Sequence, residues 1–360
     1  MVSEEGDRKR IYKGVQMSRF LVFSDLHLNA WKYGSSIDTY TGNTRLTGQV
    51  KFIEFMADYA RQREIRYVLF CGDFFHTPGS IRTEVLKSAW ASISNCATDI
   101  EFVWLVGNHD QADKAGNVHA MDFLEQFGTL CSSGTVSLPG MPPICGLDYT
   151  ESVDKLKTFL TSVPKEAIVL LHQGVSGVDI NSKGFTLNEI LNPAMIPDKI
   201  THAFSGHYHS YKRVSDKLTI PGAPMQHNWG DCGDERGFLD VVLEGGKVCI
   251  KHVNPKVNST FRKVHYDIPE EWSGNYKNDF VRVVGAPKGM EAEIKKLLDS
   301  SLFVEVESVL DRSTNVTRDK FESLETLVDV FISSLDIKGR RLEVGKGLIA
   351  GKYEAPKTSC

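Results

Sequence analysis

The sequence lacks several features that would assign it to a special class of protein. No apolar run approaches the roughly 20 residues of a membrane-spanning helix, and the polar start has no signal-peptide core. Its seven cysteines are odd in number and form no Cys-x-x-Cys pair, so neither a disulfide framework nor a cysteine zinc site is predicted. Neither sign of charge dominates, since 42 Lys and Arg face 46 Asp and Glu. We therefore expect a cytoplasmic protein without membrane contact, which would need metal ions or a local basic patch to hold a polyanion.

What the sequence does contain is typical of a globular α/β protein. It is 360 residues long, 41% hydrophobic and 24% charged. Short apolar runs, which favour strands, alternate with segments of helical periodicity. Strands are predicted at 20–23, 67–71 and 102–106, a polar loop from 24 to about 48, and helices after residue 50, at 83–96 and at 118–127. Such alternation places functional loops beyond the carboxyl ends of the strands.

Composition and pattern divide the chain into four expected segments. Residues 1–18 are polar and basic and are predicted to form a flexible arm. Residues 19–255 form the main domain, which ends in a hairpin of strands 238–243 and 247–253. Residues 256–311 are expected to form a smaller α/β domain with strands at 280–284 and 303–310 and a helix at 291–298. Residues 312–360 contain a predicted helix at 320–335 and a tail.

Five short polar segments follow apolar runs along the main domain. Each alone is common as a capped turn or a solvated loop, whereas the set in this order predicts a metal site. Carboxylate, amide and imidazole donors suit Mn²⁺, Fe²⁺ or Zn²⁺ better than Ca²⁺ or Mg²⁺. The segments are Asp25-Leu26-His27, Gly72-Asp73-Phe74-Phe75-His76, Gly107-Asn108-His109-Asp110, His172 in a Leu-His-Gln-Gly stretch, and Gly206-His207-Tyr208-His209.

Spacing within these segments indicates how the donors would be arranged. Residues two apart in an extended stretch point the same way, so Asp25 with His27 and His207 with His209 can each bracket a small site. Asp73 follows a buried strand and a glycine, and is the natural carboxylate to bridge two cations ~3.5 to 4 Å apart. Two metal ions are therefore expected, and Asp110 is expected to orient His109.

The order D-x-H, G-D, G-N-H, H and G-H-x-H resembles the calcineurin-like metallophosphoesterase superfamily. The resemblance implies a four-layer α/β fold, in which a sandwich of two β-sheets is flanked by helices. It implies His109 as the acid near the leaving oxygen. It also implies two divalent metal ions, one held by Asp25, His27, Asp73 and His209 and the other by Asp73, Asn108, His172 and His207.

Two further features are similar to the DNA-repair nucleases of the SbcD and meiotic-recombination type within that superfamily. His76 stands three residues after Asp73, and residues 221–231 resemble the Gly-Ser-Pro block of those nucleases, with Ala223 in place of the usual serine. Residues 256–311 resemble their small capping domain, and the chain length is nearest to phage recombination endonuclease subunits. The resemblance implies an Mn²⁺-dependent DNA exonuclease or endonuclease, in the host cytoplasm if a phage encodes it, in which His76 helps to place the phosphate or the strand end.

Other residues are candidates for contacts with substrate. Trp31, Lys32 and Tyr33 combine stacking surface with a cation, as single-strand contacts do, although an aromatic loop is often a packing lid. His227 is expected either to touch substrate or to cap a turn. DNA is the expected substrate.

Two protein partners are expected. An SMC-like ATPase of the SbcC type would bind the apolar stripe of the helix at 320–335. Alternatively, this stripe would pack on the capping domain. A homodimer would form through four apolar side chains of the first helix, Phe52, Phe55, Met56 and Tyr59.

Two alternative functions stay open at this level. The same dimetal site would serve a phosphomonoesterase or a cyclic-nucleotide phosphodiesterase equally well. The second alternative is a DNA-binding scaffold whose phosphoesterase site has decayed. The ligands argue against it, because every expected metal position still holds a competent donor.

Overall fold

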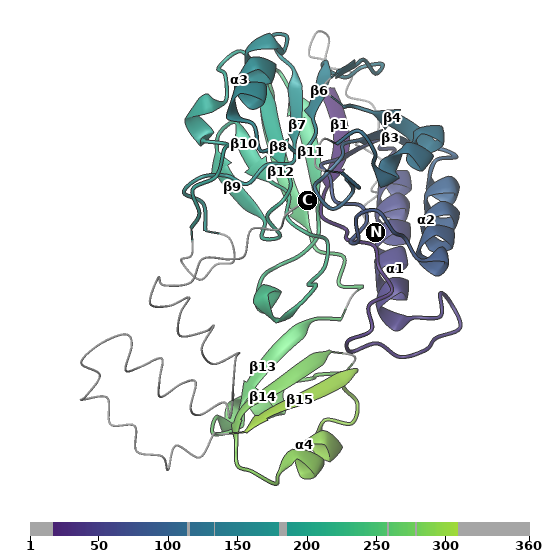
Figure 1. Cartoon of the computed structure of the whole chain (residues 1–360), viewed down its shortest axis with the longest axis vertical. Coiled ribbons are helices and arrows are strands. Elements are labelled where there is room, and N and C mark those ends of the chain that lie inside the picture. Colours follow the sequence, from purple (N-terminus) through teal and green to yellow (C-terminus); the bar gives the residue numbers. More distant parts are fainter. Residues whose placement is uncertain are drawn as a thin grey trace, which may run out of the picture. The chain divides into compact units, whose positions relative to one another are not determined.

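The computed structural model describes residues 17–113, 116–132, 134–179, 186–257, 259–277 and 279–308 (Figure 1). The chain divides into two units, residues 1–308 and 309–360, and every described residue lies in the first. The helix expected at 320–335, and with it the whole segment 312–360, lies outside the described residues, as do residues 1–16 of the expected arm. No helix in the described part of the chain is long and apolar enough to cross a membrane.

The first sheet has the strand order β12-β11-β1-β2-β3-β4. Its parallel part follows the expected alternation of strands and helices, and the predicted hairpin β11–β12 extends it with antiparallel pairing. The strands are β1 (Met17–Phe23), β2 (Tyr67–Phe70), β3 (Glu101–Trp104), β4 (Gly128–Leu130), β11 (Phe238–Glu244) and β12 (Lys247–Val253).

The second sheet has the order β5-β6-β7-β8-β10-β9. Its central strands β6, β7, β8 and β10 are parallel, and β5 and β9 run antiparallel at the two edges. The strands are β5 (Thr135–Val136), β6 (Ile144–Leu147), β7 (Ile168–Leu171), β8 (His202–Ser205), β9 (Lys212–Ser215) and β10 (Leu218–Ile220).

Helices cover the outer faces of both sheets (Figure 1). Two helices, α1 (Thr44–Gln62) and α2 (Thr83–Cys96), pack on the first sheet, and α3 (Val153–Ser162) packs on the second. Side-chain acceptors cap two of them, since Asn43 accepts from the first turn of α1 and Ser152 from that of α3. Short 3₁₀ turns complete the chain: η1 (Ala120–Phe127), η2 (Pro193–Met195), η3 (Trp229–Asp231) and η4 (Pro269–Ser273).

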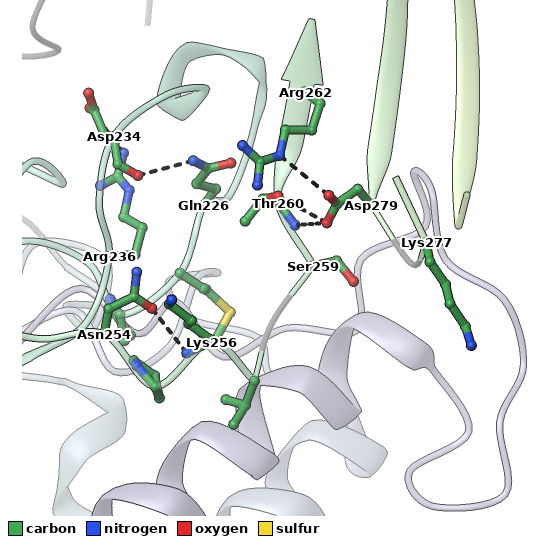
Figure 2. Close-up of a pocket in the computed structure, with 14 residues that line it drawn as sticks. Gln226, Asp234, Arg236, Asn254, Lys256, Ser259, Thr260, Arg262, Lys277 and Asp279 are labelled. Carbon is green, nitrogen blue, oxygen red and sulfur yellow. Dashed lines mark hydrogen bonds and ion pairs between the residues drawn. The ribbon is translucent and has the colours of Figure 1, made fainter. Parts of the chain in front are cut away.

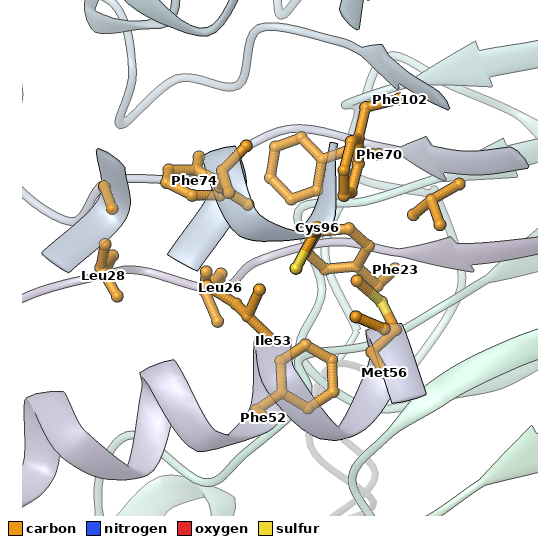
Figure 3. Packing of buried hydrophobic residues seen from close by; sticks show 14 of the residues in the cluster. Phe23, Leu26, Leu28, Phe52, Ile53, Met56, Phe70, Phe74, Cys96 and Phe102 are labelled. Atoms are coloured by element: carbon orange, nitrogen blue, oxygen red, sulfur yellow. The ribbon is translucent and has the colours of Figure 1, made fainter. Parts of the chain in front are cut away.

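Alternating side chains of the strands build two hydrophobic layers on the first sheet. Phe20 and Val22 of β1 face the second sheet, where they belong to one cluster with Ile168 and Phe204. Leu21 and Phe23 of the same strand point the other way, into the layer under α1 and α2 that Figure 3 shows. A third cluster joins the second sheet to α3. This helix, sheet, sheet, helix arrangement confirms the predicted four-layer α/β fold.

A third, smaller sheet contains three parallel strands, β13 (Phe261–His265), β14 (Phe280–Ala286) and β15 (Phe303–Ser308), and a helix α4 (Glu291–Leu297). Val264, Val281, Val283 and Ile294 form its core. The strand β13 was not predicted from the sequence, because its five residues carry only two buried side chains and give little periodicity.

Three local predictions differ from the structure. Strand β1 begins at Met17 rather than Phe20, because Met17 and Ser18 pair with β11. Helix α1 begins at Thr44, inside the predicted loop, where Asn43 caps it. Residues 120–127 form a 3₁₀ helix instead of an α-helix. Strand β15 runs to Ser308, and the predicted residues 309 and 310 lie outside the described residues.

The surface predicted for dimerisation is wrong. Phe52 and Met56 are fully buried and Tyr59 is 7% exposed, because α1 presents these side chains to its own sheet. The rings of Phe52 and Tyr59 contact Phe238 of β11, and Phe52 also contacts Phe23 of β1 (Figure 3). Phe55 packs against the same cluster. A dimer stays a prediction with no surface assigned to it.

Candidate metal centre

The two sheets bring their carboxyl ends to one place, and the predicted ligands follow those ends. On the first sheet, Asp25 and His27 come after β1, Asp73 after β2 and Asn108 after β3. On the second sheet, His172 comes after β7, and His207 and His209 come after β8. The structure brings all seven predicted ligands together.

The Asp73 carboxylate lies between imidazoles of the two sheets. Its Oδ2 atom is 3.5 Å from Nε2 of His27 and 3.3 Å from Nε2 of His172. On the His27 side, His209 places its Nε2 3.2 Å from that of His27. Asp25 completes this side, since donor atoms of Asp25, His27 and His209 lie within 4.8 Å of one another. A carboxylate oxygen at this place has the position that bridging two cations requires.

The other side is formed around the Asn108 amide oxygen. This Oδ1 atom lies 3.1 Å from Nε2 of His172 and 3.0 Å from Nδ1 of His207. Donor atoms of Asp25, Asp73 and His172 also lie within 4.8 Å of one another. The donors thus separate into two groups that share Asp73.

The chemistry of this donor set fits divalent transition-metal ions. His27 and His209 face each other through Nε2 atoms that can share only one proton, and the Asn108 oxygen faces two imidazoles. Buried nitrogen and oxygen atoms that converge in this way can give their lone pairs to cations placed between them. Two groups of mixed nitrogen and oxygen donors therefore suit two divalent ions.

Four of the seven ligands hold a backbone conformation that side chains rarely adopt. Asp25, His27, Asp73 and His207 have φ angles of 53°, 48°, 61° and 87°. Such left-handed residues cost of order 1–3 kcal/mol each and persist where the surroundings impose them. Here the loops impose them, since the amides of Asp25 and His27 donate to the carbonyls of Gly72 and Asp73.

The glycines before Asp73 and Asn108 are required for the close approach of ligands. A Cβ on Gly72 would overlap the His172 imidazole, and one on Gly107 would overlap the Asp73 carboxylate. Gly72 also has a φ of 93°. The Gly-Asp and Gly-Asn pairs in the motifs therefore have a steric origin.

Asp110 does not orient His109, which corrects the prediction. Its buried carboxylate accepts from the backbone amides of Asp73 at 2.8 Å, Phe75 at 2.9 Å and Gly107 at 3.0 Å. Burial raises its pKa to about 7, with the Asp73 charge adding to the shift. Asp110 thus fixes the loops that carry Asp73 and Asn108.

Hydrogen bonds behind the ligands orient the imidazoles. His172 donates its Nδ1–H to the Cys71 carbonyl at 2.6 Å, which leaves Nε2 for the centre. His209 places Nδ1 3.5 Å from the Asp231 carboxylate, which also pairs with Arg236 at 3.1 Å. The sequence analysis missed this role of Asp231, although Asp231 stands in the acidic turn of the block that resembled nucleases.

Burial and mutual charge set the protonation of the ligands. Burial lowers the pKa of His207 to about 4 and that of His27 well below its usual value, so both are neutral near pH 7. Burial would also lower the pKa of His172, but the Asp73 charge raises it to about 9. Burial raises the pKa of Asp25. Burial opposes the charge of Asp73 as well, but His172 and His109 together lower the pKa of Asp73.

His109 and His76 lie together beside His27. The His109 amide donates to Asp73 at 2.8 Å, and its Nδ1–H donates to the His76 carbonyl at 2.6 Å. The two rings stack at 5.3 Å, and burial lowers the pKa of His76 to about 4. Nδ1 of His76 is 3.5 Å from Nδ1 of His27, and Trp31 lies 4.2 Å from the His76 ring.

The other residues predicted to contact substrate differ in exposure. Lys32 and Tyr33 are exposed, but the Tyr33 hydroxyl donates to Glu305 at 2.7 Å and accepts from Trp229 at 2.9 Å. His227 is only 4% exposed and donates from Nε2 to the Asp25 carbonyl at 3.0 Å. This burial favours a positioning role for His227 over contact with substrate.

A cavity of about 280 Å³ adjoins the centre at Asn108. Tyr149 lines it and stacks on His207 with ring centroids 5.7 Å apart. No motif pointed to Tyr149, since a lone aromatic after a strand gives no pattern. The remaining lining comes from Pro78, Gln111, Ala112, Asp113, Thr150, Glu151 and Lys155.

Comparison with known proteins agrees with this geometry. Residues 18–211, more than half of the chain, match the family model of the calcineurin-like phosphoesterases.

Several solved structures resemble this chain in fold at low sequence identity. GAP50, the anchor in the inner membrane complex of Plasmodium, is 14% identical over 67% of this chain and 85% of its own, with a TM-score of 0.43. A dimetal phosphatase from Danio rerio is 12% identical, over 65% of this chain and 98% of its own, with a TM-score of 0.43. A purple acid phosphatase from yellow lupin is 13% identical, over 66% of this chain and 51% of its own, with a TM-score of 0.39. These distant likenesses carry no argument about activity.

Proposed function

The chain belongs to the calcineurin-like phosphoesterase family, and from this premise we propose that it is a manganese-dependent DNA nuclease of the SbcD type. It would hydrolyse phosphodiester bonds with two divalent ions. One ion would be held by Asp25, His27, Asp73 and His209 and the other by Asp73, Asn108, His172 and His207. Bound there, the ions supply a nucleophilic hydroxide at neutral pH and neutralise the charge of the phosphate.

The residues around the ions would orient the substrate and move one proton. His109 donates its Nδ1–H to the His76 carbonyl, so Nε2 is the atom that holds a proton for the departing sugar oxygen. Asp110 keeps the loop amides in place, and Asp231 keeps the ring of His209 in place.

The observation that carries the choice of DNA is the position of His76. Its ring contacts His109, Trp31 and His27, so an imidazole and the indole of Trp31 lie next to the metal ligands. Stacking of a base on an aromatic side chain and an imidazole close to the phosphate are features that a strand end can use. Manganese is proposed because it accepts both the carboxylate and the imidazole donors of this set.

The test uses the purified full chain with Mn²⁺ or Mg²⁺ on end-labelled duplex, single-stranded and hairpin DNA, beside bis-p-nitrophenyl phosphate. The nuclease proposal expects DNA cleavage with Mn²⁺, and the label identifies the polarity of digestion. His76→Gln should reduce DNA cleavage more than hydrolysis of the small diester. His265→Gln, which changes an exposed histidine on β13, is the matched control and should change neither.

A phosphomonoesterase or cyclic-nucleotide phosphodiesterase is the second candidate, and the cavity beside Asn108 favours it because about 280 Å³ suits a small substrate. Turnover of small phosphoesters with all DNA left intact would contradict the nuclease proposal and select this candidate. No bound transition metal and no activity after addition of Mn²⁺ would instead indicate a decayed scaffold that binds DNA.

We also propose an SMC-like ATPase as partner, a homodimer and a cytoplasmic location, on the resemblance and on the near-neutral charge of the chain. The segment 312–360 is proposed to dock the ATPase. Its deletion should spare Mn²⁺-dependent cleavage of short DNA and abolish ATP-stimulated processing with the partner. A truncated chain that still binds the ATPase with full affinity would show that this segment is not the docking element. Light scattering of the full chain would test the homodimer.

A further inference from the structure

Two cavities differ in their relation to the metal centre. The cavity of about 280 Å³ includes the predicted ligand Asn108 in its wall. A larger cavity, of about 480 Å³, contains no predicted ligand among the described residues of its wall (Figure 2). Its carboxylates are also paired, since Asp234 lies 3.3 Å from Arg236. Asp279 likewise lies 3.3 Å from Arg262. Of these two cavities, the smaller is therefore the one that a group attached to the reacting phosphate can enter.

Tyr149 provides an aromatic wall for the smaller cavity. The residue is partly exposed, and its ring stacks on that of His207, with centroids 5.7 Å apart and planes 27° apart. The ring centroid of His172 is 6.3 Å away. His207 and His172 are both proposed ligands of the second ion. A planar group that stacks on Tyr149 would therefore be adjacent to a phosphate bound by that ion.

The backbone of Tyr149 is tied to the loop that carries Asn108. The Tyr149 amide donates to the carbonyl of Val106, just after β3, at 3.1 Å. The Tyr149 carbonyl accepts at 3.1 Å from Nε2 of Gln111, which stands three residues after Asn108. An aromatic wall that is fixed in this way loses little conformational freedom when a ligand binds.

The charges of the smaller cavity favour a neutral group over a phosphate. Its charged wall residues are Asp113, Glu151 and Lys155, so two carboxylates face one ammonium group. The excess of negative charge repels a phosphate from the cavity and leaves it to the two ions. Carboxylate oxygens accept hydrogen bonds from N–H groups, which nucleobases carry. Ligand cavities usually have about 300–1,000 Å³, so this one suits a single nucleoside.

We propose that this cavity binds the nucleoside attached to the reacting phosphate, with its base stacked on Tyr149. The inference deepens the proposed phosphodiester hydrolysis and rests on it. The nucleoside belongs either to a nucleic-acid strand or to a free nucleotide, since both present a base next to the phosphate. Tyr149 thereby selects nucleotide esters over simple phosphodiesters.

The place of His109 indicates which nucleoside enters the cavity. His109, proposed to protonate the leaving oxygen, lies beside His27, with ring centroids 4.7 Å apart. Tyr149 lies beside His207, in the other group of donors. The leaving oxygen therefore faces the His27 side, and the cavity holds the nucleoside that keeps the phosphate.

The test measures hydrolysis of three esters that release p-nitrophenol, by the full chain with Mn²⁺. The esters are the 5′- and 3′-(p-nitrophenyl phosphate) of thymidine and methyl p-nitrophenyl phosphate, which has no nucleoside. Tyr149→Leu should raise KM for the preferred thymidine ester about ten-fold and leave kcat nearly unchanged, because stacking of the base is lost. KM for the methyl ester should not change.

Two variants serve as controls. Tyr149→Phe keeps the aromatic ring and should retain the KM of the unmodified chain. Tyr40→Leu removes a tyrosine that is 59% exposed in the loop before α1, and it should change KM for none of the esters. Metal content and thermal unfolding of each variant separate a lost nucleoside contact from a disturbed centre.

Cleavage of single-stranded dT12 distinguishes the two sources of the nucleoside. A loss of kcat/KM in Tyr149→Leu for both dT12 and the thymidine ester supports a strand, whereas a loss for the thymidine ester alone supports a free nucleotide. The proposal is overturned if Tyr149→Leu raises KM equally for the methyl and thymidine esters. It is also overturned if the unmodified chain has no lower KM for either thymidine ester than for the methyl ester.

A chain that hydrolyses none of these substrates would contradict the proposed function and not this site. Calorimetry of thymidine 5′- and 3′-monophosphate with the Mn²⁺-loaded chain then decides. Weaker binding by Tyr149→Leu than by Tyr149→Phe would keep the site, and equal binding or no binding would overturn it.

Discussion

The two sheets of the sandwich contribute to the metal centre in different ways. The first sheet supplies both carboxylates, the amide of Asn108 and a single imidazole, and three of its ligands have left-handed φ angles. The second sheet supplies imidazoles only, and His207 alone of its ligands has such an angle. The negative charge and most of the backbone strain thus belong to one sheet, and the other provides neutral or protonated partners.

This difference means that neither sheet forms a site alone. The Asp73 carboxylate of the first sheet raises the pKa of His172 on the second, and the His172 charge helps to lower the pKa of Asp73. Each group is stabilised in its charged form in part by the partner across the sandwich. Packing of the two hydrophobic faces is therefore a condition for the chemistry.

Loss of the shared carboxylate should have the largest effect on this arrangement. Asp73→Asn on the first sheet should lose both metal ions and reduce hydrolysis to background, because a neutral amide in place of the carboxylate cannot bridge two cations. His172→Gln on the second sheet should lose one ion and keep the other. Metal content by elemental analysis, with hydrolysis measured alongside, checks both, and two tightly bound ions in Asp73→Asn would show that the carboxylate is not shared.

His109 should affect turnover without affecting the metals. His109→Asn removes the group that holds the proton for the leaving oxygen, so kcat should fall on the order of 10² to 10⁴. The metal content should be unchanged, since His109 is not among the proposed ligands. The measurement compares kcat for substrates with good and poor leaving groups, and an equal loss for both would argue against His109 as the acid.

The close approach between the sheets should be visible in stability. Gly72→Ala places a Cβ against His172 and strains a residue with a φ of 93°, so it should lower the unfolding free energy by about 1–3 kcal/mol or more. Gly140→Ala is the matched control, since Gly140 also has a positive φ but open space around its Cβ position. Urea unfolding of the metal-free protein should show a larger loss of unfolding free energy for Gly72→Ala than for Gly140→Ala. Equal losses would mean that backbone strain alone, and not the contact with His172, destabilises Gly72→Ala.

A smaller, pH-dependent effect is expected inside the first sheet. Asp240 of β11 accepts from Arg19 of β1 at 2.9 and 2.7 Å and from Tyr59 at 2.7 Å. Burial opposes the charge of Asp240, but Arg19 lowers its pKa below the usual value. The stabilisation is therefore present above about pH 4, the unfolded value, and is lost as the pH falls through the lower folded value.

Asp240→Asn measures this contribution. Arg19 is partly exposed, so the variant should lose only about 1 kcal/mol at pH 7, and it should approach the unmodified chain in acid, once the pH lies below the folded pKa of Asp240. Urea titrations at the two pH values give the comparison. A constant difference at both values would assign the loss to packing and not to the ion pair.

The sequence predicted the fold and the ligand set because both depend on local patterns. Apolar runs of four residues followed by Asp, Asn or His indicate a strand and the loop at its carboxyl end, as at β2 and Asp73. The role of Asp110 depends on contacts with residues 35 to 37 positions away in the chain, which no local pattern encodes. The apolar face of α1 likewise looks the same in sequence whether it covers its own sheet or a second molecule.

The pairing of β1 has a consequence for the order in which the protein is assembled. β1 lies between β2, which follows about 45 residues later, and β11, whose residues lie more than 200 positions away. During synthesis one edge of β1 therefore stays open until almost the whole main domain has left the ribosome. Contacts of such long sequence separation slow folding, and an open strand edge invites pairing with other chains. Asp25 and His27, at the end of this strand, hydrogen-bond to the loop after β2, whereas β11 closes the other edge of the strand last.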